Sequence, residues 1–377
     1  KRQAKRQEAV KTIAKQPEWF QAYQAFGLHF TAEPGAFEGF QQWRNEPTRL
    51  LGLKWLNIAR MILPMLLIIG ALYCSFTDTT FYILLPIIII NGVILNRYWS
   101  YASQTVEQTS NALNLMKSLR LQMEQINGLI TKDDFTKTLA APFVDAQKSA
   151  NKAIGKLNRY LNQLETRKNL LHGFFNVPLL LDVQWLFKLE QWKVEHDEEL
   201  TTWLQNLAEF EVLVSLAGTS FANPDWAMPS GSTEAYYIRA EDMGHPMIQQ
   251  ETSVGNDFSL AGRGQVVLLT GPNMAGKSTF LRTMAVNIVL ARLGGVVCAR
   301  ALSLDFDMQV FTAMRVADDL SENVSSFYAE INRIHSLLKL VEEDKKVLYF
   351  LDEILKGTNS ADRHKGAEGL IKQLSKS

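Results

Sequence analysis

A glycine-rich loop in the C-terminal part of the chain carries the clearest chemistry. Its sequence, Gly-Pro-Asn-Met-Ala-Gly-Lys-Ser from Gly271 to Ser278, fits the pattern G-x-x-x-x-G-K-S of a phosphate-binding P-loop. In such a loop, backbone N–H groups and the N-terminus of the next helix surround the phosphates. The Lys277 ammonium is expected to reach the β- and γ-phosphate oxygens, and the Ser278 hydroxyl to ligate Mg²⁺. The predicted ATP-binding residues are Gly271, Pro272, Asn273, Met274, Ala275, Gly276, Lys277, Ser278 and Thr279.

Two adjacent carboxylates form a second candidate feature. Asp352 and Glu353 directly follow the apolar run Val347–Leu351, which is typical of a buried strand. In P-loop ATPases an acidic residue at this strand end orients Mg²⁺ or its waters, and this role is predicted for Asp352. Glu353 is placed to polarise the attacking water as general base. We therefore predict Glu353 and Lys277 as catalytic residues, and Ser278 and Asp352 as magnesium ligands.

The loop needs elements that hold it in place. Gln265–Thr270 is a short, β-rich apolar run and is predicted to be a buried strand. An apolar-periodic helix is predicted from about Ser278 to Leu293, ending at Gly294-Gly295. Strand, loop and helix in this order predict an α/β P-loop NTPase domain, and the family resemblance described next implies an ABC-type ATPase. The chain contains no L-S-G-G-Q sequence, which argues against an ordinary ABC transporter.

The loop and its neighbours resemble the MutS family, whose loop reads G-P-N-M-x-G-K-S. Further matches follow in the family's order: Gly244-His245-Pro246, Asn256-Asp257, Ala317-Asp318-Asp319-Leu320, Ser325-Ser326-Phe327 with Glu330, Asp352-Glu353-Ile354 and Gly357-Thr358-Asn359-Ser360. His245, between Gly and Pro, is predicted to be a turn residue. The resemblance covers an ATPase domain over 235–377, which it implies is C-terminally incomplete. The family's helical lever and core would cover much of 100–234.

The resemblance implies a homodimer that binds ATP and Mg²⁺ in a composite site. Ser325 and Ser326 would reach across the dimer interface to the γ-phosphate held by the other subunit's P-loop, and Gly357–Ser360 would lie at the same interface. Ser325 and Ser326 also suit a helix N-cap before Phe327, and both interpretations can hold.

Several positions depart from the family pattern. Ala313 and Arg315 occupy the family's basic and glycine positions, Leu355-Lys356 replaces a Gly-Arg pair, and Val324 stands where the signature often has Arg. These changes leave the phosphate and magnesium chemistry intact but put the coupling between subunits in doubt.

A hydrophobic hairpin over 55–99 precedes the helical region. The uncharged runs Met61–Phe76 and Phe81–Leu95 are separated by the polar turn Thr77–Thr80. Each run is slightly shorter than the ~20 residues that span a bilayer core, and flanking aromatic residues bring each near that length. The cations Lys54, Arg60 and Arg97 flank the outer ends, which predicts a membrane hairpin with the ATPase domain in the cytoplasm. The alternative is a helical hairpin buried in a soluble core.

Composition limits the remaining possibilities. The 377 residues carry 39 Lys+Arg and 39 Asp+Glu, so no chain-wide field attracts nucleic acid. The N-terminal region, 1–54, is predicted to be helical with breaks at Pro17, Pro34 and Pro47. Its basic start suits a solvated helix face, or alternatively a contact with nucleic acid or anionic lipid. Cys74 and Cys298 are predicted to be reduced, buried thiols. The chain starts at Lys1 and not at Met, which suggests a fragment.

Two functional hypotheses follow. In the first, the protein is a membrane-tethered ATPase resembling those of DNA mismatch repair, and it binds DNA or a DNA-associated partner. In the second, it is a membrane-associated mechanical ATPase that moves its lever against a protein partner without DNA. The Phe-x-Glu sequence with which the family reads mismatches does not occur in this chain. Salt-dependent DNA binding would separate the two.

Overall fold

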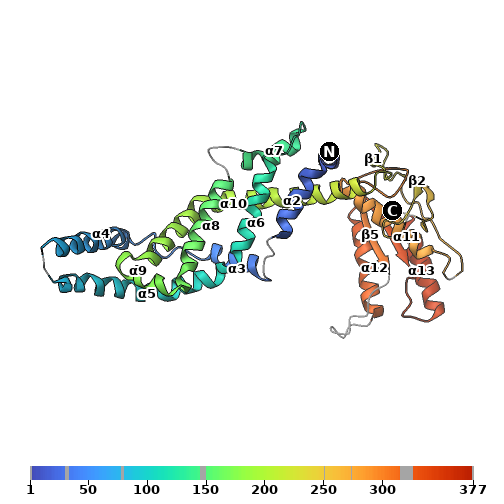
Figure 1. Ribbon diagram of the computed structural model, residues 1–377. Coiled ribbons are helices and arrows are strands. Elements are labelled where there is room, and N and C mark those ends of the chain that lie inside the picture. The colour runs from blue at the N-terminus through green and yellow to red at the C-terminus, as the bar shows by residue number, and fades with distance from the viewer. Residues whose placement is uncertain are drawn as a thin grey trace. The chain divides into compact units, whose positions relative to one another are not determined.

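The computed structural model describes residues 2–29, 34–77, 80–144, 150–249, 251–272, 274–314 and 326–375. The chain forms two compact units (Figure 1). The helical unit comprises Gln16–Val212, and the C-terminal unit combines Lys1–Lys15 with Leu213–Ser377.

The helical unit confirms the helical periodicity of the sequence. Its elements are α2 (Pro17–His29), α3 (Ala36–Asn45), α4 (Lys54–Thr77), η1 (Phe81–Leu84), α5 (Leu85–Ser110), α6 (Ala112–Ile126), α7 (Asp134–Val144), α8 (Ala150–Glu165), η2 (Thr166–Lys168), α9 (Leu170–Leu179) and α10 (Leu181–Ala222). The last residues of α10 belong to the C-terminal unit. Part of the core is aromatic, since Trp19, Tyr23 and Phe143 all lie against Phe210 on α10.

A buried carboxylate on α10 joins the helices that lead into the hairpin. Glu190 accepts backbone N–H bonds from Arg49, Leu50 and Leu51, in the turn before α4, at 2.7–3.2 Å. The hydroxyl of Tyr101 on α5 donates to the same carboxylate at 2.8 Å. A buried charge is tolerated when hydrogen bonds satisfy it, and here one side chain fixes both arms of the hairpin to α10.

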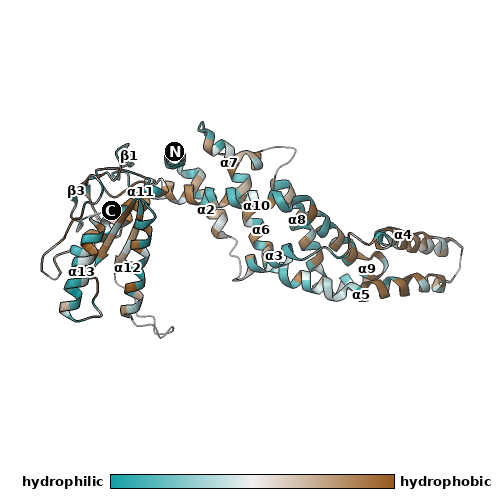
Figure 2. Cartoon of the chain, turned by 180° about the vertical axis from the view of Figure 1, so that it is seen from behind, coloured by the Kyte–Doolittle hydropathy of each residue, from teal (hydrophilic) through white to brown (hydrophobic). Residues whose placement is uncertain are grey.

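The hairpin of α4 and α5 forms as two long helices, but it is not a buried core element. Only 17% of the most apolar stretch of α4 and 22% of that of the second arm are buried. By length and composition both helices could cross a membrane. Figure 2 shows mostly apolar colour on α4 and on the part of α5 nearest the turn. The alternative of a hairpin buried within this chain's own core is therefore not what the fold contains.

The described residues of the C-terminal unit form two small sheets. The first has the order β1-β4-β2-β3 and comprises β1 (Ser230–Gly231), β2 (Ile238–Met243), β3 (Asn256–Leu260) and β4 (Ala301–Leu304). In the second, β5 (Gln309–Met314) pairs in parallel with β6 (Val347–Asp352). Its helices are α1 (Arg2–Ala14), α11 (Lys277–Leu293), α12 (Ser326–Glu342) and α13 (Ser360–Leu374).

Two hydrophobic clusters hold these layers together. In the first, Met284 and Ile288 of α11 pack with Ile238 of β2, Leu302 of β4 and Phe350 of β6. The second cluster joins β5 to the two C-terminal helices and contains Phe311, Ile334, Leu337, Leu355, Leu370 and Leu374. Because α11 contributes to the first cluster and contacts β5 and β6, it is held against the strand that ends in Asp352.

Two predictions about this unit are wrong. Gln265–Thr270 is not a buried strand, since it pairs with neither sheet and Val267 and Leu268 are exposed. An apolar run becomes a strand only where a neighbouring strand satisfies its N–H and C=O groups, and the run itself does not specify that neighbour. Cys298 is only partly buried, whereas Cys74 is buried and both thiols are free, as predicted.

Candidate nucleotide-binding site

The glycine-rich loop ends where α11 begins. Gly276 has φ 85° and precedes Lys277, the first residue of α11. A left-handed residue at this position favours glycine, because a side chain there would be strained. Phe280 N donates to Gly276 O at 2.8 Å, the first bond of the helix. The helix therefore starts directly at the Gly-Lys-Ser part of the loop and aims its free N–H groups into it.

Lys277 lies across the loop. Its ammonium donates to the carbonyl oxygens of Gly271 at 2.9 Å and Pro272 at 2.6 Å. Met274 is fully exposed with φ 65°, and Asn273 lies outside the described residues. Ser278 is partly exposed and Thr279 is exposed. The cation, the hydroxyls and the helix N-terminus thus share one accessible position that suits a polyphosphate.

A buried amide that the sequence analysis missed anchors α11 behind the loop. Asn287 donates to Gly244 O at 3.0 Å and accepts from Cys298 N at 2.7 Å. It joins the P-loop helix to the Gly244-His245-Pro246 segment. His245 lies in a turn there, as predicted, with Ile248 N donating to its carbonyl oxygen. The sign in the sequence was the amide of Asn287 on a mostly apolar helix face.

The predicted carboxylates stand at the end of β6. Asp352 is the last residue of that strand and pairs in register with Met314 of β5. Glu353 follows in an exposed position with φ 52°, and its carboxylate forms an ion pair with Lys356. Leu355 also has a positive φ, 58°. Both residues therefore have left-handed backbone conformations, which cost free energy in residues other than glycine. Two such residues within one turn are typical of functional loops.

The loop after β6 is held by three further residues. Glu330 of α12 accepts the backbone N–H of Leu355. Arg363 of α13 donates to the carbonyl oxygens of Leu355, Lys356 and Thr358 at 3.0–3.2 Å. Gly357 lies so close to Phe327 that an added Cβ would be 2.6 Å from the Phe327 Cβ. Glu330 belonged to a recognised motif, whereas Arg363 gave no sign in the sequence.

Part of the predicted site lies outside the described residues. This holds for Ser325, Arg315, Val324 and the segment Ala317–Leu320. Ser326 is the first residue of α12, which agrees with the predicted helix start. Asn359 caps α13, since its side chain accepts from Asp362 N at 2.9 Å.

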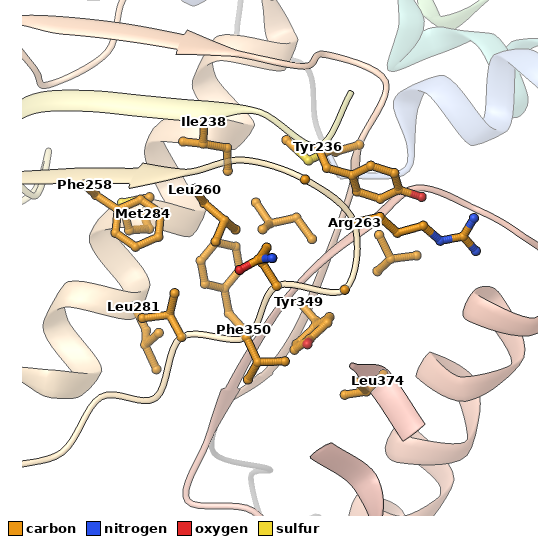
Figure 3. Close-up of a pocket in the computed structure, with 18 of the residues that line it drawn as sticks. Tyr236, Ile238, Phe258, Leu260, Arg263, Leu281, Met284, Tyr349, Phe350 and Leu374 are labelled. Atoms are coloured by element: carbon orange, nitrogen blue, oxygen red, sulfur yellow. The ribbon is translucent and has the colours of Figure 1, made fainter. Parts of the chain in front are cut away.

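An apolar cavity of about 120 Å³ lies beside the loop and not in it (Figure 3). Residues of β2, β3 and β6 line it together with Gln265–Val267 and Leu269. None of the described residues of the loop Gly271–Ser278 contributes to its wall. The cavity is therefore distinct from the phosphate-binding position, and it forms where the unpaired run lies between the two sheets.

The fold and the loop together define a P-loop nucleotide-binding domain. Residues 267–377 match the family model of MutS domain V. The match begins in the run before the P-loop and includes Asp352 and Glu353. The resemblance of the loop to the MutS family is confirmed.

Similar proteins include several described as DNA mismatch repair protein MutS. The one from Clostridium kluyveri is 27% identical over 271 residues, covering 68% of this chain and 30% of the relative. The one from an Exiguobacterium strain is 26% identical, covering 72% and 32%. MutS 1 from Haloarcula marismortui is 33% identical, covering 45% and 18%. The longer matches exceed the C-terminal unit and so extend into the helical unit. The chain spans about a third of these first two relatives.

Proposed function

We propose that the C-terminal unit binds Mg-ATP on the loop Gly271–Thr279 and hydrolyses the nucleotide. The observation that carries this proposal is the position of Lys277 and Ser278 at the N-terminus of α11, which packs against the strand ending in Asp352. The hydroxyl and carboxylate oxygens of Ser278 and Asp352 are hard donors that suit Mg²⁺. The metal would neutralise phosphate charge when bound.

The residues have separate roles in the proposed reaction. Lys277 and the N–H groups of the loop bind the β- and γ-phosphates and stabilise the charge that develops on them. Glu353, exposed at the end of β6, accepts a proton from the attacking water. Glu330 and Arg363 position the Glu353 loop through their hydrogen bonds to its backbone. Ser325 and Ser326 complete the site from the second subunit of a homodimer.

The whole protein is proposed to be a MutS-like ATPase that works on DNA, because its relatives are described as DNA mismatch repair proteins. The hairpin of α4 and α5 is proposed to anchor it in a membrane, with the ATPase unit in the cytoplasm. Support comes from two long apolar helices whose side chains are mostly exposed, because such surfaces are costly in water. A mechanical ATPase acting on a protein has no specific observation in its favour.

Nucleotide binding tests the proposal. Lys277→Ala removes the cation from the loop and should weaken the binding of a fluorescent ATP analogue more than 10-fold, or about 1.4 kcal/mol. Lys339→Ala, at an exposed position on α12, should bind as the wild type does. Equal affinities for the wild type and Lys277→Ala would refute the assignment of the loop.

Fractionation tests the membrane anchor. The full chain, expressed in cells, should stay in the membrane pellet after an alkaline wash, and deletion of 55–99 should release it. Wild-type protein in the soluble fraction without detergent would refute the anchor and leave the nucleotide site untouched.

A further inference from the structure

The short helix α9 has the reverse of the usual arrangement of polar and apolar faces. Its polar residues His172 and Asn176 are buried, whereas Phe174 and Phe175 are 77% and 50% exposed. On a helix at the surface of a water-soluble protein, the apolar face is buried and the polar face is exposed. The outer face of α9 therefore suits apolar surroundings.

The buried face of α9 is satisfied by a network of charges and amides. Asp182 of α10 lies 3.0 Å from His172 Nε2 and accepts from Asn176 Nδ2 at 2.9 Å. The guanidinium of Arg167 lies 2.9 Å from the same carboxylate. Buried groups of this kind are stable when paired. The inner face is thus a built polar contact, so α9 is held in the orientation that turns its two phenylalanines outward.

Side chains cap the C-terminal end of α9. Asn91 of α5, fully buried, donates to the carbonyl oxygens of Val177 at 2.9 Å and Pro178 at 3.4 Å. Gln184 donates to Leu179 O at 2.9 Å. The last carbonyls of a helix have no partner within the helix, and inside lipid each needs an internal donor. Asn91 meets that need within an apolar stretch of α5, between exposed Ile89 and Val93.

Contacts at two positions on α5 fix where α9 lies along the hairpin. It packs against both α4 and α5, and it is apolar in Figure 2 as they are. Asn91 contacts its C-terminal end, while Trp99 of α5 lies 4.3 Å below the guanidinium of Arg167, just before α9. The eight residues from Asn91 to Trp99 correspond to about 12 Å of helix. Trp and Arg are typical of the membrane interface.

We propose that α9 is a third membrane element, which enters the lipid bilayer beside the hairpin but does not span the bilayer. Its N-terminal end lies at the interface near Trp99, and its C-terminal end lies about 12 Å deeper. Phe174 and Phe175 contact the acyl chains of phospholipids in the leaflet on the ATPase side. This inference rests on the proposed membrane hairpin, because α9 packs against α4 and α5 and its depth in the bilayer depends on theirs.

Site-directed fluorescence tests the proposal. The full chain with Cys74→Ala and Cys298→Ala carries one new cysteine, Phe174→Cys, labelled with an environment-sensitive fluorophore and placed in phosphatidylcholine–phosphatidylglycerol nanodiscs. We expect blue-shifted emission and at least twofold stronger quenching by doxyl groups near the head of the acyl chain than by groups near its end. Leu72→Cys on α4 is the reference inside the bilayer. Val194→Cys on α10, which is 65% exposed where Phe174 is 77% exposed, is the aqueous control.

The outcomes separate the two proposals. If the label at 174 behaves as the one at 194 does while the label at 72 is quenched, α9 lies outside the lipid and this inference is wrong. If the label at 72 also shows aqueous emission, the membrane hairpin itself is wrong. Phe175→Cys repeats the measurement on the same face and gives a second readout where Phe174→Cys folds poorly.

Discussion

At the scale of single residues, Glu353 combines exposure with an unfavourable backbone. Its φ of 52° places it just beyond the end of β6, in a turn that Glu330 and Arg363 hold from α12 and α13. A carboxylate that served only packing would not need this conformation. The cost is consistent with a side chain that must project from the strand end towards a substrate.

The first prediction is that Glu353→Gln binds ATP as the wild type does but hydrolyses it about 100-fold or more slowly, because an amide accepts no proton. Phosphate release by the dimer and equilibrium binding of an ATP analogue measure the two effects. Glu342→Gln, at the exposed end of α12, should change neither. Wild-type turnover by Glu353→Gln would assign the base elsewhere.

A second prediction concerns a buried acid away from the site. Burial raises the pKa of Asp305, but its hydrogen bonds with Lys346 and with the N–H groups of Asp307 and Tyr236 lower that pKa overall. A lowered pKa in the folded state gives stability that is present above the unfolded value, 3.8, and lost as pH falls through the folded value. The wild type should therefore lose stability below about pH 4.

Asp305→Asn removes this contribution. Its free energy of unfolding at pH 7 should fall by about 1–3 kcal/mol, with less change between pH 4 and pH 3 than in the wild type. Hydrogen exchange over β4 and β5 measures the local effect, and Asp225→Asn is the exposed control. A pH profile of Asp305→Asn that parallels the wild type would contradict the assignment.

At the scale of elements, helices followed from the sequence and sheet pairing did not. The periodic runs predicted the helical region and the two hairpin helices, because a helix satisfies its backbone internally. Both ends of the P-loop helix were predicted to within one residue, because a glycine stands next to each end. In the structure Gly276 and Gly294 both have left-handed backbone conformations. Gln265–Thr270 was predicted wrongly, because a strand depends on a partner distant in sequence. Lys277, Ser278 and the two acids were found by motif, whereas Asn287 had only the sign of an amide on an apolar helix face and Arg363 had none.

The element-scale prediction concerns Glu190 of α10. Glu190→Ala leaves the N–H groups of Arg49, Leu50 and Leu51 and the Tyr101 hydroxyl without their buried acceptor. We expect the free energy of unfolding of the helical unit to fall by about 3 kcal/mol or more. Tryptophan fluorescence during urea titration in detergent measures this fall. Glu198→Ala, on the exposed part of the same helix, is the control, and equal midpoints for both variants would refute the anchoring role.

At the scale of the whole molecule, the charge distribution decides how DNA could bind. The net charge of zero provides no general attraction, so binding depends on a local basic surface. The helix α1 offers one, because Val10 and Ile13 are buried in the C-terminal unit while Arg2, Lys5, Lys11 and Lys15 are exposed. This agrees with a solvated helix face and leaves a phosphate contact open to test.

The last prediction is that this chain binds duplex DNA weakly, through phosphates and without mismatch preference. Affinity should fall steeply with salt, because each phosphate contact releases a counterion. Matched and mismatched duplexes should bind within about threefold of each other, or under ~1 kcal/mol. Fluorescence anisotropy in detergent at two salt concentrations, with and without ATP, measures both.

A charge-reversal pair localises that contact. Lys5→Glu with Lys11→Glu on α1 should reduce the affinity at low salt at least 10-fold and flatten the salt dependence, because two phosphate contacts are lost. Lys132→Glu with Lys137→Glu makes the same change of net charge on exposed residues of the helical unit and should have a smaller effect. Equal losses in both pairs would show that overall charge controls binding and not α1. A mismatch preference above 10-fold would show that the protein reads the bases. It would contradict the prediction, because phosphate contacts carry no sequence information.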